Sequence, residues 1–105
     1  KETIGIRYQD LDKMAPIVAD VKAMLRAHPE IDTSATLIVN FNQFAASSLN
    51  FFIYTFTKTV EWVYYHEVKQ DVLLKIADII RAHGAEIAFP THTVHLETAT
   101  GEAAE

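Results

Sequence analysis

Residues 49–57, LNFFIYTFT, decide the fold of this chain. Successive side chains of a β-strand point to opposite faces of a sheet, and in this stretch both faces are apolar. One face carries Leu49, Phe51 and Ile53, and the other carries Phe52, Tyr54 and Phe56. A strand with two apolar faces needs cover on both sides.

The segment before it alternates in the same way. Residues 36–44, TLIVNFNQF, place Leu37, Val39 and Phe41 on one face of a second strand. Only the small residues 45–48, AASS, connect the two segments. Such a short connection predicts an antiparallel hairpin.

The N-terminal part of the chain predicts a strand and then a helix. Residues 3–8 alternate and place three apolar side chains on one face, namely Ile4, Ile6 and Tyr8. Apolar residues then recur with helical spacing over residues 14–25, namely Met14, Ile17, Val18, Val21 and Leu25. The helix should end at about residue 27, ahead of a proline.

The start of this first helix carries recognisable signals. We expect Asp10 and Asp12 to accept hydrogen bonds from its first free N–H groups. Pro16 fits only in the first turn, where a missing N–H costs nothing.

A second, longer helix follows the hairpin. We expect Thr59 to cap it, with Glu61 in the positive first turn, and Gly84 to end it with a left-handed residue. Its apolar stripe comprises Tyr65, Val68, Val72, Ile76, Ile79 and Ile80.

The order of predicted elements defines the fold class. A short strand at residues 86–89, cut by Pro90, completes the order βαββαβ. This is an α+β, ferredoxin-like sandwich with two helices on one face of an antiparallel or mixed sheet. Residues 1–90 form this domain, residues 91–96 form a C-terminal extended strand, and residues 97–105 form an acidic tail that we expect to be disordered.

The sheet face away from the helices predicts a subunit or domain contact. Phe52, Tyr54 and Phe56, with Ile38 beside them, form an apolar patch that is large for a monomer. Alternatively, the tail or the segment after Pro90 folds back over it. That segment also has unpaired backbone groups, which copies in neighbouring subunits would satisfy.

Composition excludes several classes of function. The net charge of −5 and a pI near 5.4 argue against nucleic acid, which needs a concentrated basic surface. Cysteine is absent, so no disulfide or thiolate metal site is possible. The first residue is Lys1, from which we expect an excised or processed fragment, and no apolar run is long enough for a membrane helix.

No catalytic site, cofactor site or metal site is predicted. His92 and His95 would point to opposite faces of a strand, and His66 and His83 lie too far apart on one helix. His28 and His83 suit the negative ends of helices. We expect Asp71 to lie on a solvated helix face. We expect Trp62 to pack inside the domain and not to belong to a functional site.

Related folds leave one alternative open. An acylphosphatase needs an anion-binding loop after the first strand, where this chain has acidic residues 8–12. An RNA-binding domain would use sheet aromatic residues but also a basic run, which is missing. A small-molecule-sensing regulatory domain has a similar topology and binds its ligand between paired domains. This function remains the alternative.

Two motifs resemble the cytoplasmic domain of MscS-type mechanosensitive channels. The first is the hairpin of residues 37–41 and 45–51, LIVNF and AASSLNF. The second is the ending of residues 84–91, GAEIAFPT, followed by the extended residues 93–96. The resemblance runs in order over residues 4–96, nearly the whole chain.

The resemblance implies a function in a membrane protein. It implies a homo-oligomer, a heptameric cage below the pore of a channel in the cell membrane, which filters solutes and releases ions and small osmolytes on hypo-osmotic shock. Phe89 and Pro90 would form the turn out of the sheet. Thr93, Val94, His95 and Leu96 would form a strand of a barrel between subunits. The membrane helices and the middle domain of the family lie outside this sequence.

Overall fold

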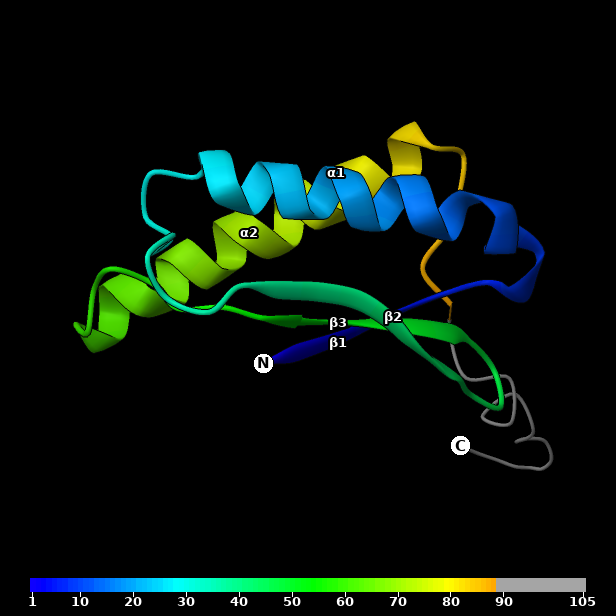
Figure 1. Cartoon of the computed structure of the whole chain (residues 1–105), viewed down its shortest axis with the longest axis horizontal. Helices are drawn as coiled ribbons and strands as arrows, with labels where there is room; N and C mark the ends of the chain where they lie inside the picture. The colour runs from blue at the N-terminus through cyan, green and yellow to red at the C-terminus, as the bar shows by residue number, and fades with distance from the viewer. Residues whose placement is uncertain (89–105) are drawn as a thin grey trace, which may run out of the picture.

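The chain folds into a layer of helices over a layer of strands, as the computed structural model of residues 1–88 shows (Figure 1). Helices α1 (Met14–Ala27) and α2 (Trp62–Ala82) lie on one face of the sheet. The sheet contains β1 (Glu2–Ile6), β2 (Ile38–Phe44) and β3 (Leu49–Tyr54). The α+β class is therefore confirmed.

The order of the strands is β1-β3-β2, and both pairings are antiparallel. The apolar strand β3 lies in the centre, where Phe51 pairs with Ile4 on one side and with Phe41 on the other. The predicted hairpin is confirmed, with a bulge between Phe41 and Gln43. Beyond Tyr54 the chain stays extended, and Thr57 forms a single bridge with Ile31.

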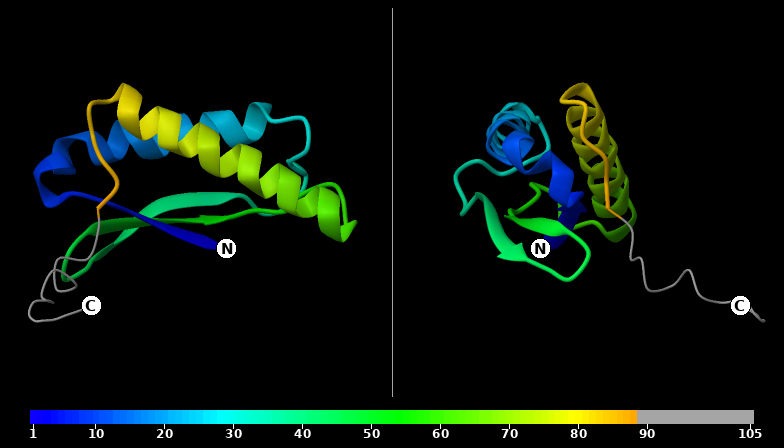
Figure 2. Two further views of the ribbon diagram at one scale, coloured as in Figure 1. Left: turned by 180° about the vertical axis from the view of Figure 1, so that it is seen from behind. Right: turned by 90° about the vertical axis from the view of Figure 1, so that its right-hand side faces the viewer.

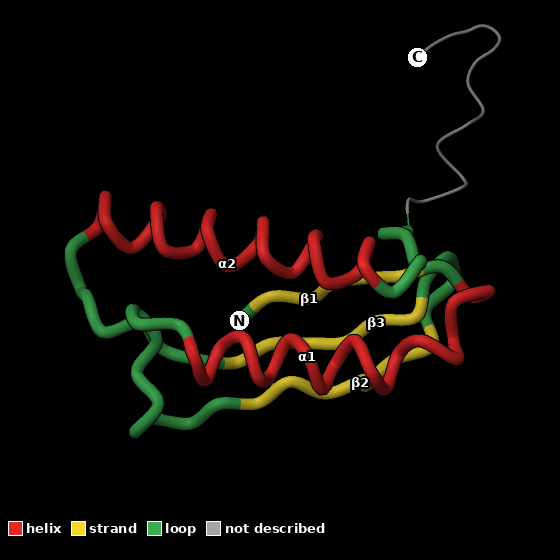
Figure 3. The backbone as a smooth tube through the Cα atoms, turned by 90° about the horizontal axis from the view of Figure 1, so that it is seen from above, coloured by secondary structure: helices red, strands yellow, loops and turns green. Residues whose placement is uncertain are grey.

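The core lies between the helices and the inner sheet face. Figure 3 shows the two helices side by side above the strands, with α2 running along β1. The core consists of residues from both predicted helix stripes and from the inner face of β3. Its fully buried members include Ile6, Ile17, Val21, Leu25, Leu49, Phe51, Ile76 and Ile80.

The start of α1 differs from the prediction. Residues Tyr8–Lys13 form a 3-10 helix, η1, and Lys13 occupies the capping position. Asp10 is only 3% exposed and accepts hydrogen bonds from the Arg7 guanidinium at 2.9 and 3.1 Å. No side chain caps α1, so the prediction that Asp10 and Asp12 cap it was wrong, and Asp10 binds Arg7 instead. Tyr8 is likewise exposed rather than aligned with the strand's inner face.

The start of α2 lies two residues later than predicted. The Glu61 carboxylate accepts the N–H groups of Val63 and Tyr64, so Glu61 is the cap. Thr59 accepts the N–H of Glu61 instead. The predicted left-handed stop is confirmed at Gly84, whose φ is +75°.

The predicted fourth strand is reduced to a single bridge. Ile87 pairs with Ile6 antiparallel, flanked by hydrogen bonds from Arg7 to Glu86 and from Ala88 to Gly5. The segment therefore lies beside β1, where a ferredoxin-like sheet has its last strand. The extended strand at residues 91–96 and the tail at residues 97–105 lie outside the described residues.

Two histidine–aspartate contacts join the helices. His28, at the end of α1, lies 2.7 Å from the Asp71 carboxylate of α2, and His83, after α2, lies 2.7 Å from Asp20 of α1. The Asp71 side chain is 47% exposed, in keeping with the predicted solvated face, and it contacts both His28 and Lys75, which the sequence analysis did not predict.

Candidate subunit interface

Among residues 1–88, no helix lies on the second face of the sheet (Figure 2). We call the apolar residues on this side, Ile38, Phe52, Tyr54 and Phe56, the outer face. Tyr54 is 37% exposed and its ring meets that of Phe56 edge to face at 5.3 Å. Ile38 and Phe52 are half-buried, and the Lys1 ammonium lies 5.3 Å from the Phe52 ring centre. The structure brings these four residues together on one side, while their role as a subunit contact stays a prediction.

The same side of the sheet is polar near the hairpin. The Ser48 hydroxyl donates to Asn50, and the Asn50 amide donates to Gln43. Gly5 of β1 lies directly opposite Asn50. A contact that buries apolar area on this side would therefore centre on Tyr54 and Phe56.

A second apolar cluster was missed by the sequence analysis. Val60 is fully exposed at 101%, Trp62 is 73% exposed, and Val63 beside them is exposed. The prediction that Trp62 packs inside the domain was wrong, because the first turn of α2 extends past the end of the sheet (Figure 1). The sequence carries no signal for this exposure, because it depends on the end of β3 at Tyr54, which the predicted strand of residues 49–57 placed later.

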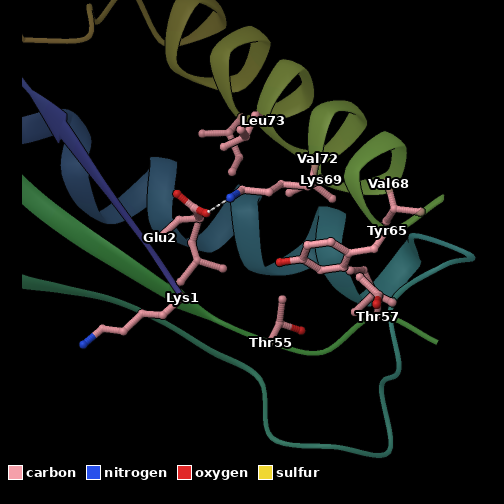
Figure 4. A pocket seen from close by; sticks show the side chains of 12 residues that line it. Lys1, Glu2, Thr55, Thr57, Tyr65, Val68, Lys69, Val72 and Leu73 are labelled. Carbon is pink, nitrogen blue, oxygen red and sulfur yellow. Dashed lines mark ion pairs between the residues drawn. The ribbon is translucent and has the colours of Figure 1, made fainter. Parts of the chain in front are cut away.

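A small cavity lies between α2 and the edge of the sheet (Figure 4). Its volume is about 60 Å³, and Thr55, Tyr65 and Lys69 supply polar groups to its wall. The buried Thr55 hydroxyl has no partner among the described residues, and a bound water molecule would satisfy it. The cavity has room for a few water molecules and is too small for an amino acid or a nucleotide.

Charges around these surfaces are largely paired. The Arg7 guanidinium, by hydrogen bonding, and the Glu86 N–H hold the pKa of Asp10 below its usual value. The Glu2 carboxylate lies 2.6 Å from the Lys69 ammonium at the cavity mouth, and this hydrogen bond raises the pKa of Lys69. Neither group is arranged as a catalytic acid or base.

Within residues 1–88, no set of three histidine, aspartate or glutamate side chains is close enough to hold a metal ion. His92, His95 and the predicted interface residues Phe89, Pro90, Thr93, Val94 and Leu96 lie outside the described residues. Neither α1 nor α2 combines the length and the hydropathy that crossing a membrane requires.

A protein family matches nearly the whole described part of the chain. The family described as "Mechanosensitive ion channel MscS, C-terminal" matches residues 2–87. The chain therefore belongs to the MscS family of mechanosensitive ion channels, and it corresponds to the C-terminal part of that family.

Individual relatives agree with this assignment. The low conductance mechanosensitive channel YnaI of Escherichia coli is 51% identical over 98 residues, which cover 93% of this chain and 29% of YnaI. The small-conductance mechanosensitive channel MscMJ of Methanocaldococcus jannaschii is 31% identical over 96 residues, covering 90% and 27%. The chain thus spans less than a third of either relative.

A solved structure shows the same fold. MSL1 of Arabidopsis thaliana superimposes with a TM-score of 0.74 at 21% identity, over 85% of this chain and 32% of that chain. At this identity the likeness concerns the fold alone.

Proposed function

We propose that this chain is the cytoplasmic vestibule domain of a mechanosensitive channel that releases ions and small osmolytes on hypo-osmotic shock. Its membership in the MscS family carries the proposal, since YnaI and MscMJ are both named as mechanosensitive channels. In this proposal the domain assembles with copies of itself and filters solutes on their way to the pore, and it has no catalytic role.

The outer face supports assembly. Tyr54 and Phe56 are exposed aromatic side chains on the face that no helix of the described residues covers. Covering several hundred Å² of such surface stabilises a complex by several kcal/mol, at about 25 cal/mol per Å², before the cost of association. In a homo-oligomer, another copy of the chain would cover this surface.

The stoichiometry and the C-terminal contacts are part of the same proposal. We expect seven copies in the full-length protein, with Phe89 and Pro90 turning the chain out of the sheet. The segment Thr93, Val94, His95 and Leu96 then pairs with its copies in a barrel. Deletion after Pro90 should leave the domain folded and lower the yield of closed rings, and a normal heptamer yield would contradict this.

The function is tested by osmotic shock. The full-length protein is expressed in bacteria that lack their own mechanosensitive channels, and survival of a sudden dilution is counted. Survival should rise, and membrane patches should show conductance when suction is applied. The function would be refuted if the protein reached the membrane and gave no rise in survival and no conductance under suction.

The outer face is tested separately on the 105-residue chain. Tyr54→Glu and Phe52→Glu should lower the mass measured by light scattering over micromolar concentrations while leaving the circular dichroism unchanged. Leu74→Glu is a matched control, because Leu74 is exposed on α2 away from the outer face. Equal masses for wild type and variants would contradict the proposed contact.

Calorimetry separates this function from the small-molecule-sensing alternative. The vestibule proposal expects no heat of binding from amino acids or nucleotides. A saturable heat from one of them would favour the sensor.

A further inference from the structure

The imidazole ring of His28 is held through both of its nitrogens. Nε2 lies 2.7 Å from the Asp71 carboxylate of α2, and Nδ1 accepts the backbone N–H of Glu30 at 3.1 Å. Because a backbone N–H can only donate, Nδ1 carries no proton, and the ring proton lies on Nε2, which donates to Asp71. These contacts therefore fit the neutral form of His28, whose side chain is only 6% exposed.

The second histidine–aspartate contact between the helices is built differently. His83 Nε2 also lies 2.7 Å from a carboxylate, that of Asp20, but within residues 1–88 no backbone N–H donates to its ring. The His83 side chain is 26% exposed and that of Asp20 is 57% exposed. A proton added to His83 therefore displaces no hydrogen bond, whereas a proton added to Nδ1 of His28 must displace the N–H of Glu30.

The charged groups around His28 do not offset that loss. The hydrogen bond from His28, and a further one from Lys75, hold the pKa of Asp71 below its usual value, so Asp71 stays ionised. Its side chain is 47% exposed and lies 3.4 Å from Lys75, so its attraction for a charged ring is weakened by water and shared. The Glu30 carboxylate is bound to Tyr64, and this hydrogen bond raises the pKa of Tyr64. Protonation of His28 thus places a charge where little water reaches and leaves a backbone donor unpaired.

The turn that contains Glu30 holds the extended segment after β3. The Lys58 N–H donates to the Glu30 carbonyl at 2.9 Å, and the Asp32 N–H donates to the Phe56 carbonyl at 2.8 Å. Phe56 belongs to the outer face. The turn therefore connects the His28 ring to one end of that face.

From these contacts we propose that His28 is a pH-sensitive latch. In its neutral form it closes the turn of residues 28–32, and its protonation opens this turn and loosens the segment that carries Phe56. Histidine suits such a role because its charge ordinarily changes between about pH 5 and pH 8. The latch acts within one subunit and does not depend on the proposed function. Its consequence does rest on that function, since acidification then weakens the packing of subunits through the outer face.

Amide hydrogen exchange of the 105-residue chain, followed by NMR, tests the latch. It is measured at about pH 7.5 and about pH 5.5, on either side of the ordinary titration of histidine. The protection factors of the Glu30 and Lys58 amides, which correct for the intrinsic effect of pH, should fall about tenfold in acid, the equivalent of one net hydrogen bond. His28→Gln has no titrating ring, and its protection should be the same at both pH values. His83→Gln is the matched control and should lose protection as the wild type does.

The latch is overturned if protection of Glu30 in the wild type is the same at both pH values, or if His28→Gln loses protection equally. Should His28→Gln fail to fold, the wild type decides: the ring nitrogens of His28 should titrate with the same midpoint as the loss of Glu30 protection, and different midpoints refute the latch. Light scattering on the same samples measures assembly. Lost protection with an unchanged mass refutes only the link to the outer face, and a fall in mass without lost protection refutes the latch.

Discussion

The two faces of β3 have nearly the same composition and opposite surroundings. Leu49, Phe51 and Ile53 point into the core and are buried, whereas Tyr54 on the other face stays exposed. Both helices cover the first face, and residues 1–88 place no helix on the second (Figure 2). An apolar pattern in a strand therefore shows that cover is needed, but whether the same chain provides it depends on where the helices lie.

The largest expected effect contrasts the two faces directly. Phe51→Ala should lower the free energy of unfolding by about 3–5 kcal/mol, because it leaves a cavity in a fully packed core. Tyr54→Ala should change it by less than about 1 kcal/mol, since the side chain is partly in water already. Urea denaturation of the 105-residue chain measures both. Similar losses for the two variants would mean that the outer face is packed as tightly as the inner one.

A second prediction concerns the link between η1 and the segment beside β1. Asp10 accepts two hydrogen bonds from Arg7 and one from the Glu86 N–H. Asp10→Asn keeps the shape but removes the charge, and it should lower the free energy of unfolding by about 2 kcal/mol at pH 7. The variant should therefore loosen the contact between η1 and residues 85–88 without changing the outer face.

The pH dependence of that variant follows from the direction of the pKa shift. The Arg7 hydrogen bonds lower the pKa of Asp10 in the folded state. The resulting stability is fully present above the unfolded value of about 4 and is lost as the pH falls through the lower folded value. From pH 5 down to pH 2, wild type should therefore lose more stability than Asp10→Asn. Parallel losses would show that the carboxylate has no such role.

The sequence predicted the parts of this structure that depend on periodicity. Alternation and helical spacing placed the hairpin, both helices and the inner core residues such as Phe51 and Ile76, because burial on one face leaves a regular pattern. It failed where a side chain had two competing partners. Aspartate is a common helix cap, but Asp10 instead accepts hydrogen bonds from the charged guanidinium of Arg7 in a buried contact.

The candidate interface was predicted only in part for a related reason. Tyr54 stands out because it alternates with the buried residues of β3, and Phe56 continues that alternation beyond the end of the strand. Trp62 continues the apolar stripe of α2, so spacing alone predicts burial. Its exposure depends on the length of β3 relative to α2, which is a property of the assembled layers and not of either segment.

A smaller effect than that of Asp10→Asn is expected at the polar end of the outer side. A methyl group on Gly5 would come within 2.8 Å of the Asn50 amide oxygen and 2.9 Å of Ser48 Cβ. Gly5→Ala should therefore lower the free energy of unfolding by about 1 kcal/mol, since this overpacking outweighs the entropy gained in the unfolded chain. Adding Ser48→Gly removes one of the two clashes and should restore part of the loss in urea denaturation. If Gly5→Ala were neutral and the second change had no effect, this end would be as loosely covered as Tyr54, and the contrast between the two faces would extend along the whole sheet.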